Sequence, residues 1–446
     1  MNIIIVGAGR VGYTAAEVLS QVHNLLLIEN DIDKAETSKN LLNVSVLNDD
    51  GTNPAVIRDA IRRNQADVII STTIQDEDNL FICMMAKRIK PEIRTIARVR
   101  NPDYFIPTSK DAVDQIISPE LIAAQKIATL ALLENAVDYE TLEAFNMGLA
   151  TFLVSKDNEK IIGSVVISLG IPEDVNVVAI YRGDEVITET ETLELHLGDK
   201  ISVLGSPEGL SRFNQMMGLP SEANEFIILG GGVTGSNTAG ILESKKRYVK
   251  LIEPDVELCR KLARTFSNVI VVNGNIVDPH VLQTENVGRA DVVIAISDTD
   301  ETNLLASLMA MKLGAPKIIA KYSMVEYEDI FDFTGIQTMI GYHRIVANEI
   351  TKTLVSDETS LLQMKREGET FFSVRVSPKS RLVDERFGDI SFPKGAKPTC
   401  IVRDGIVIYP RMDTVFKSGD KVLMFTYKVD MQKLNRLFGM KIDINV

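Results

Sequence analysis

The stretch NIIIVGAGRVG at residues 2–12 decides the fold, and EFIILGGGVTG at residues 225–235 repeats it. Each stretch is a short apolar run followed at once by the glycine pattern GxGxxG. This pattern is typical of a buried strand that turns sharply into a helix. The first glycines of the two motifs, Gly7 and Gly230, lie 223 positions apart. The chain is therefore an internal duplication, and each half helps to interpret the other.

The duplication extends beyond the glycine motifs. ADVIISTTIQDEDN at 66–79 is matched by ADVVIAISDTDETN at 290–303, and RTIAR at 94–98 is matched by KIIAK at 317–321. Short apolar runs also alternate with helix-length segments. In the first half these runs lie at 3–6, 25–28, 68–70 and 95–97. They predict strands of a parallel sheet that helices cover on both faces.

The final part of each half changes to short strands of alternating polarity, which predicts a small separate lobe. The strands are expected at 177–182, 185–187 and 200–204, and again at 399–403, 406–408 and 421–425. Arg182 and Arg403 lie 221 positions apart, and so do Asp199 and Asp420. The lobe is therefore duplicated as well.

The predicted fold class is α/β, with two Rossmann-like parallel-sheet domains, each followed by a small α+β lobe. We place the four domains at 1–135, 136–221, 222–355 and 356–446. Ser118, Pro119 and Glu120 predict the start of a helix over 121–135, with the serine as its N-cap.

Composition narrows the class of protein. The chain has 446 residues and a formal net charge of −13, so its surface repels phosphate backbones and nucleic-acid binding is not expected. No run approaches the roughly 18–20 apolar residues of a membrane-spanning helix, and the chain opens into a strand pattern rather than a cleavable leader. We expect a cytosolic protein with no direct membrane insertion. Cys83, Cys259 and Cys400 are too few for a disulfide framework and are interpreted as core or incidental thiols.

The first glycine motif has the context of a nucleotide-binding loop. Its residues are Gly7, Ala8, Gly9, Arg10, Val11 and Gly12. Glycines let backbone N–H groups approach a pyrophosphate, and the following helix N-terminus stabilises its charge. Glu29 ends the second strand, where a carboxylate can accept both ribose hydroxyls. The alternatives are a tight turn without a ligand and, for Glu29, a solvated loop acid.

Glu29 also bears on which nucleotide would bind. Its carboxylate would repel a ribose 2′-phosphate, so NAD(H) or an adenine nucleotide such as ATP or ADP fits better than NADP(H). Asp50 ends the third strand, where it would reach an adenine edge. Asp49 and Asp50 could equally be turn formers that bond to their own backbone.

Other side chains stand where phosphates would lie. Thr72 and Thr73 follow the fourth strand and offer hydroxyls, and Arg98 ends the fifth strand at the same edge of the sheet. Arg10 and Arg98 would both hold phosphate, because a guanidinium matches phosphate oxygens with two hydrogen bonds. Alternatively, the threonines are loop residues and the arginines are solvated surface charges.

The second half keeps the scaffold but changes the side chains. The matching residues are Gly230, Gly231, Gly232, Val233, Thr234, Gly235, Glu253, Asn275 and Lys321. Thr234, Asn275 and Lys321 replace an arginine, an aspartate and an arginine of the first half. Two charged groups become neutral, and a planar guanidinium becomes a point charge. The second site is therefore weaker, prefers another nucleotide or is empty.

Groups that would make the chain an enzyme are hard to find. Hydride transfer usually needs a positioned acid or base, often a histidine or a tyrosine–lysine pair. The four histidines are scattered, no tyrosine precedes a lysine by four residues, and neither metal-ligand spacing nor a GxSxG motif occurs. The residues favour a regulatory binding subunit. The alternative is an NAD-dependent dehydrogenase with a duplicated Rossmann core.

Together these features resemble the TrkA family, the peripheral NAD-binding regulators of Trk potassium transporters, whose subunit carries two tandem RCK units. The resemblance covers the whole chain. It is carried by the opening glycine motif, by the segments that end at Asn79 and Asn303, by IARVRNPDY at 96–104, and by the GDKI and GDKV turns at Gly198 and Gly419.

The resemblance implies that the nucleotide contacts the glycine loop and the polar residues at the strand ends in each half. In the first half these are residues 7–11, Glu29, Asp50, Thr72, Thr73 and Arg98, and in the second they are residues 230–234, Glu253, Asn275 and Lys321. The resemblance also implies a homotetramer whose eight RCK units form a ring beneath the pore subunit of a membrane potassium transporter, at the inner face of the cell membrane. Nucleotide-dependent changes in ring shape would gate ion flow without chemistry on the ligand. The helices at 121–135 and 342–355 are then expected to pack or exchange between subunits.

Overall fold

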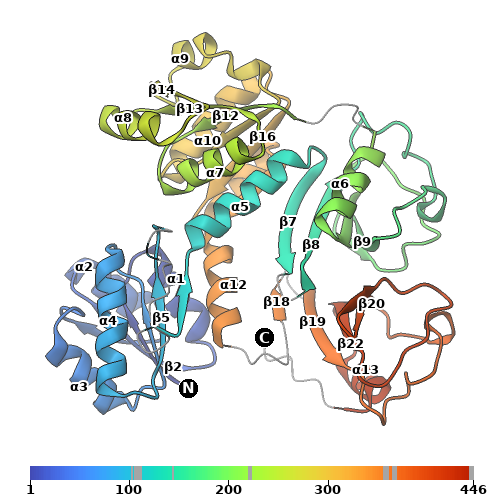
Figure 1. Ribbon diagram of the computed structural model, residues 1–446, viewed down its shortest axis with the longest axis horizontal. Helices are drawn as coiled ribbons and strands as arrows, with labels where there is room; N and C mark the ends of the chain where they lie inside the picture. The colour runs from blue at the N-terminus through green and yellow to red at the C-terminus, as the bar shows by residue number, and fades with distance from the viewer. Residues whose placement is uncertain are drawn as a thin grey trace.

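The computed structural model describes residues 1–101, 104, 113–142, 145–218, 223–354, 361–363 and 369–440. Figure 1 shows two α/β bodies at the left and top of the view and two small lobes at the right. Across these residues, no helix is both long and apolar enough to cross a bilayer. The joints expected near 222 and 356 lie outside the described residues, and the four domain boundaries stay predictions.

The first α/β domain is a parallel sheet with the strand order β3-β2-β1-β4-β5-β6. Its strands are β1 (Asn2–Val6), β2 (Asn24–Glu29), β3 (Ser45–Asn48), β4 (Val68–Ser71), β5 (Arg94–Arg98) and β6 (Gln115–Ile117). Its helices are α1 (Arg10–Leu19), α2 (Ile32–Leu41), α3 (Pro54–Asn64) and α4 (Asp76–Ile89). Ile3, Ile4 and Ile5 are all buried because helices cover both faces. The order reverses at β1, and ligands bind at such a switch point beyond the carboxyl ends of the strands.

The second α/β domain repeats this topology with the strand order β14-β13-β12-β15-β16-β17. Its strands are β12 (Glu225–Leu229), β13 (Tyr248–Glu253), β14 (Val269–Asn273), β15 (Val292–Ala295), β16 (Lys317–Tyr322) and β17 (Thr338–Gly341). Its helices are α7 (Val233–Ser244), α8 (Val256–Thr265), α9 (Pro279–Thr284), α10 (Asp300–Lys312) and α11 (Glu326–Thr334). The α/β class and the Rossmann-like duplication are thus confirmed.

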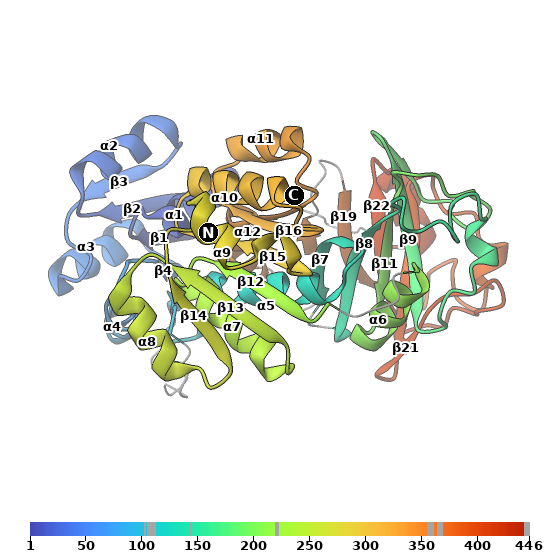
Figure 2. The same ribbon diagram turned by 90° about the horizontal axis from the view of Figure 1, so that it is seen from above.

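The two lobes are antiparallel sheets with the orders β10-β9-β11-β8-β7 and β18-β19-β22-β20-β21. The first contains β7 (Ala136–Leu142), β8 (Met147–Leu153), β9 (Val175–Arg182), β10 (Glu185–Ile187), β11 (Lys200–Gly205) and α6 (Pro207–Met216). The second contains β18 (Leu361–Gln363), β19 (Glu369–Arg375), β20 (Ala396–Arg403), β21 (Ile406–Ile408), β22 (Lys421–Tyr427) and α13 (Met431–Phe438). The lobes share an apolar cluster that includes Leu149, Leu204, Phe371 and Phe425, and they lie side by side in Figure 2.

The same ion pair fixes a turn in each lobe. Two nitrogens of Arg182 lie 2.9 and 2.8 Å from the carboxylate oxygens of Asp199. Arg403 makes the same two contacts with Asp420, both at 2.8 Å. Burial acts to raise the pKa of Asp199, but the hydrogen bonds from Arg182 outweigh it and lower that pKa overall. This geometry explains why both residue types recur 221 positions apart.

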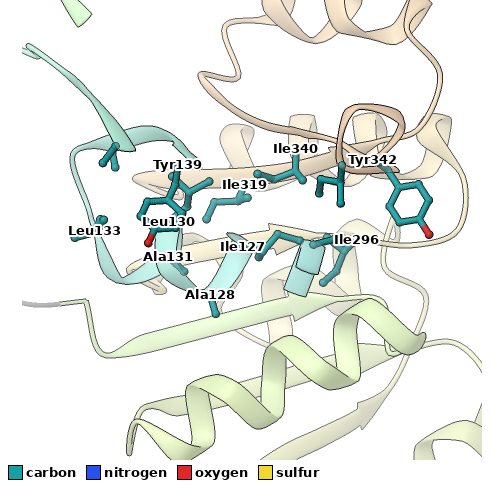
Figure 3. Close-up of a cluster of buried hydrophobic side chains, with 14 of the residues drawn as sticks. Ile127, Ala128, Leu130, Ala131, Leu133, Tyr139, Ile296, Ile319, Ile340 and Tyr342 are labelled. Carbon is teal, nitrogen blue, oxygen red and sulfur yellow. The ribbon is translucent and has the colours of Figure 1, made fainter. Parts of the chain in front are cut away.

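Two helices exchange between the halves of the chain. Helix α5 (Pro119–Leu132) follows the first sheet but packs against α7 of the second domain, and α12 (Tyr342–Leu354) follows the second sheet but packs against α1 of the first. Figure 1 shows both crossings, and Figure 3 shows Ile127 of α5 beside Ile296 and Ile319 of the second domain. These helices were expected to exchange between subunits, and the structure shows that they already exchange within one chain.

The start of α5 agrees with the prediction in position, since Ser118 is the N-cap residue and Pro119 lies in the first turn, but one detail differs. Within the described chain, the Ser118 side chain makes no capping hydrogen bond to the helix. Glu120 lies in the first turn of α5 and forms an ion pair with Arg98 at the end of β5. The helix ends at Leu132, three residues before the expected end, because the chain then turns into β7.

Candidate functional site

Two glycine loops lie at the switch points of the two parallel sheets, and their outer glycines are required by the fold. Gly7 and Gly230 have φ values of +96° and +116°, a region that side chains rarely tolerate. A Cβ atom at Gly12 would lie 1.8 Å from the Gly7 carbonyl oxygen, and one at Gly235 would lie 2.0 Å from the Gly230 oxygen. These four glycines bring strand and helix together whether or not a ligand binds.

The middle glycines leave space that the fold does not fill. A Cβ atom at Gly9 would meet nothing within 4 Å, and one at Gly232 would meet only an Asp298 oxygen at 3.8 Å. Among the described residues, α1 and α7 have neither a capping side chain nor an acid in the first turn. The first N–H groups of both helices are therefore available to an anion, and the two loops fit the pyrophosphate of a dinucleotide.

The expected ribose acids are buried and hold the loops. Glu29 accepts hydrogen bonds from the N–H groups of Ala8 and Asp31. The Glu253 carboxylate likewise accepts hydrogen bonds from the backbone N–H groups of Gly231 at 2.6 Å and Asp255 at 2.9 Å. An ionised carboxylate has about four acceptor positions, so each acid retains capacity for ribose hydroxyls. Contact with ribose stays a prediction.

Asp50 and Asn275 both form turns at the end of the third strand of each domain. The Asp50 carboxylate accepts from the Thr52 N–H at 2.8 Å and from its hydroxyl at 2.7 Å. The Asn275 side-chain oxygen accepts from the Val277 N–H at 3.1 Å. Both residues are exposed at the sheet edge. The turn-forming alternative is therefore present, and contact with adenine remains untested.

The threonines after β4 bind protein groups. The Thr72 hydroxyl donates to the carbonyls of Val6 at 3.1 Å and Gly7 at 3.0 Å, which ties β4 to the glycine loop. The N–H and hydroxyl of Thr73 donate to the Asn79 side-chain oxygen at 2.7 and 2.9 Å. A phosphate contact by either threonine stays a prediction.

Two asparagines organise the site, and sequence reasoning noted their positions but missed their role. Asn79 is fully buried, and its amide donates to the Arg98 carbonyl at 2.9 Å. Asn303 accepts from the Ser297 N–H at 2.6 Å and donates to the Lys321 carbonyl at 2.9 Å. Each asparagine joins the ends of two neighbouring strands at the cleft. The sequence signal that could have revealed this role is that Asn79 and Asn303 occupy matching positions in the two halves.

The basic residues at the ends of the fifth strands are largely buried. Arg98 binds Glu120, and its Nε has no hydrogen-bond partner in the part of the chain that the structure describes. Burial opposes the charge of Arg98, but Glu120 raises its pKa overall. Lys321 lies 5.8 Å from the centre of the Tyr342 ring. Burial lowers the pKa of Lys321, and Asp298 opposes that shift.

The two clefts face each other. The guanidinium of Arg10, in the first glycine loop, donates to the Asp298 carbonyl of the second domain at 2.7 Å. A cavity of about 820 Å³ borders the second loop at Gly231 and Gly232, and the first domain contributes Asp76 and Arg100 to its wall. The first domain therefore supplies side chains to the surroundings of the second loop, and the second domain supplies a backbone carbonyl to Arg10 of the first loop.

The sequence matches two domain families in duplicate. Residues 3–119 and 226–341 match the TrkA-N domain, and residues 149–218 and 371–439 match the TrkA-C domain. The Trk system potassium uptake protein TrkA homolog 2 of Methanosarcina mazei is 31% identical over 98% of this chain and 100% of its own length. The Trk system potassium uptake protein TrkA of Vibrio alginolyticus is 26% identical over 95% of each chain.

Solved structures share the fold. The GsuK RCK domain has a TM-score of 0.67 at 18% identity and covers 98% of this chain and 95% of its own. The GsuK channel bound to NAD has a TM-score of 0.65 at 17% identity and covers 98% of this chain and 78% of its own. A GsuK structure bound to ADP has a TM-score of 0.52 at 16% identity and covers 79% of this chain and 69% of its own.

Proposed function

Since the chain belongs to the TrkA family, we propose that it is a nucleotide-binding regulatory subunit of a membrane potassium-uptake system. One observation carries the proposal. The two glycine-loop clefts face each other through Arg10 and Asp298, and each glycine-loop helix packs against a helix from the other half. A ligand in either cleft therefore acts on the contacts that join the halves.

NAD(H) is the proposed ligand, with ATP and ADP as alternatives. The uncapped N-termini of α1 and α7 would hold the pyrophosphate, Glu29 and Glu253 the ribose, and Arg98 the phosphate charge in the first cleft. Structures that share this fold carry NAD or ADP, which supports a nucleotide in these loops.

The regulatory role follows from linkage. A nucleotide can shift the subunit between two conformations only by its difference in affinity for them, and such couplings are typically about 1–3 kcal/mol. The exchanged helices α5 and α12 lead from the clefts toward the lobes. No conversion of the nucleotide is needed for this role.

The alternative function is an NAD-dependent dehydrogenase, which belongs to a different class. We expect NADH mixed with the protein and candidate 2-oxo acids to keep its absorbance at 340 nm, a wavelength set by the nicotinamide. Turnover that disappears in a Gly9→Asp variant would support the enzyme and count against the regulator.

The proposed partner is the pore subunit of a potassium transporter. A ring of eight RCK units built from chains with two units each needs four chains, so we expect a homotetramer. Light scattering should report about four times the 49.3 kDa chain mass. A monomer at micromolar concentration, with and without NADH, would contradict this assembly.

Transport tests the regulatory role itself. Potassium flux into vesicles that contain the pore subunit and this chain should change when NADH is added. The control is a Gly9→Asp/Gly232→Asp double variant, in which both loops are blocked where an added side chain has room. Equal responses of the two proteins to NADH would contradict the proposal.

A further inference from the structure

A lysine of the second α/β domain caps the helix that enters the first lobe. Lys317 is the first residue of β16, and its Nζ lies within hydrogen-bond distance of four carbonyl oxygens at the end of α5 and in the turn into β7, so its three N–H groups share four acceptors. They belong to Leu130 at 2.7 Å, Leu133 at 2.8 Å, Glu134 at 3.1 Å and Ala136 at 2.8 Å. The last carbonyls of a helix lack partners within it and carry its negative pole, which favours N–H donors there. Burial lowers the pKa of Lys317 to about 7, and Glu134 opposes that shift. We call residues 130–136 the α5–β7 corner.

The other side of the α5–β7 corner is fixed to the first lobe by buried asparagines. The Asn135 N–H donates to the Asn214 side-chain oxygen at 3.0 Å. The Asn158 amide donates to the Asn135 side-chain oxygen at 3.1 Å and to the Met217 carbonyl at 2.7 Å. Asn158 is fully buried and Asn135 is nearly so. A displacement of the corner must therefore displace the lobe or break this network.

The opposite end of β16 lies in the second cleft. Lys321 stands four residues after Lys317, and its carbonyl accepts from Asn303 at 2.9 Å. Strands β15 and β17 pair with β16 on both sides, which makes it a stiff element. One strand thus runs from the expected phosphate contact to the cap on α5.

The packing around this cap is incomplete. A cavity of about 510 Å³ lies beside it, lined on one side by Glu134 and Asn135 of the corner and on the other by Ile318 and Thr338 of the second domain. Because the two bodies do not close tightly there, the Lys317 contact is a polar bridge at the edge of a void. The corner therefore has room to move relative to the second sheet.

The first half has no such bridge at the matching position. Arg94 occupies the place of Lys317 at the start of β5, and it is exposed. In the described residues, its side chain makes no hydrogen bond or ion pair. Among the residues that the structure describes, this kind of bridge is therefore seen only at Lys317.

We propose that Lys317 is the positioning residue that couples nucleotide binding in the second cleft to the first lobe. The proposal rests on the proposed function, because it needs a nucleotide in that cleft. Coupling requires a physical chain of contacts with more than one arrangement. Here the chain is Lys321, β16, Lys317, the α5–β7 corner and the asparagine network.

The test uses the full chain with Gly9→Asp, so that NADH binds only the second cleft. Calorimetry measures the affinity, and hydrogen exchange follows the amides of the edge strand β7 with and without NADH. We expect NADH to change exchange in β7 by about fivefold or more, the lower end of typical couplings. Adding Lys317→Met should remove this change while the NADH affinity stays within about threefold, since Lys317 lies outside the cleft. A merely structural cap would alter exchange equally with and without NADH.

The matched control is Arg94→Met, which should preserve the β7 response. If Lys317→Met fails to fold, Lys317→Gln keeps two N–H donors and should give a reduced response. A full response in the Lys317 variants, or NADH binding without any change in β7, would overturn this inference alone. The absence of any NADH binding in the second cleft would instead overturn the proposed function there, and the inference with it.

Discussion

The two clefts of this chain are alike where the scaffold needs them to be and differ where a ligand would touch them. Glu29 and Glu253 accept hydrogen bonds from the same two backbone positions. By contrast, Arg10 is exposed and reaches the other domain, whereas Thr234 at the matching position is buried in its own helix. Duplication has therefore preserved the loop geometry while the charge around it changed.

The basic residues of the two clefts, Arg98 and Lys321, also differ in how they are held. Arg98 is bound by Glu120 in the first turn of α5, and Lys321 lies over the ring of Tyr342 in the first turn of α12. In both halves, the residue expected to meet phosphate is held by the helix that crosses to the other half. The two contacts differ in strength. The Arg98–Glu120 ion pair is directional, whereas the cation–π contact of Lys321 with Tyr342 is weaker and less specific.

Blocking one cleft at a time should have the largest effect on nucleotide binding. Gly9→Asp and Gly232→Asp each place a carboxylate where a phosphate would sit, and both positions have room for the side chain. We expect each variant to lose one of two binding sites by calorimetry, with the tighter site lost in Gly9→Asp. Gly12→Ala is the contrasting control, because its Cβ atom would overlap the Gly7 carbonyl and disturb the fold. Equal affinities in the two surviving clefts would contradict the asymmetry.

Removing the ribose acids should have the next largest effect. Glu29→Ala and Glu253→Ala each remove an acceptor for a ribose hydroxyl, and a hydrogen bond to a charged group contributes about 1.5–3 kcal/mol. We therefore expect roughly ten- to a hundredfold weaker NADH binding in the affected cleft. Both variants should also melt earlier, because two loop N–H groups lose their acceptor. Unchanged affinity in both variants would contradict the assignment of the ribose site.

Much of this arrangement could be predicted from sequence because it is local. Apolar runs between helix-length segments indicated the parallel strands, and the recurrence of Asp199 as Asp420 indicated the duplicated lobe. The packing of α5 against the second domain could not be predicted from the sequence. An apolar helix face indicates that the helix is buried, but it does not indicate which element covers that face. The partner of Arg98 was missed for the same reason. Ser118 and Glu120 matched a capping pattern, but tertiary contact with Arg98 decided the conformation.

Arg98→Ala and Lys321→Ala probe the difference in basic residues. Arg98 already donates to Glu120, so we expect a loss of about tenfold in NADH affinity in the first cleft, and a smaller loss for Lys321→Ala in the second. Arg98→Ala also leaves Glu120 buried without its partner, which destabilises the fold. Arg98→Ala/Glu120→Gln is the control that restores stability without restoring the guanidinium. Recovery of full affinity in that double variant would show that Arg98 acts only on folding.

The smallest effect is expected for Arg10→Ala. This variant tests whether the Arg10 contact couples nucleotide binding in the two clefts. Arg10 is exposed, and water competes for its hydrogen bond to the Asp298 carbonyl, so we expect this bond to contribute about 0.5–1.5 kcal/mol, or roughly two- to tenfold in affinity, below the range of a buried charged group. We expect Arg10→Ala to weaken NADH binding in both clefts, because the first loses a phosphate donor and the second loses a contact that positions its loop. Each cleft is measured alone, in the Gly232→Asp and Gly9→Asp backgrounds. Thr234→Ala is the matched change in the second half and should affect only its own cleft, since Thr234 makes no hydrogen bond to the first loop within the described residues. An Arg10→Ala effect confined to the first cleft would mean that the contact joins the domains without linking their ligands.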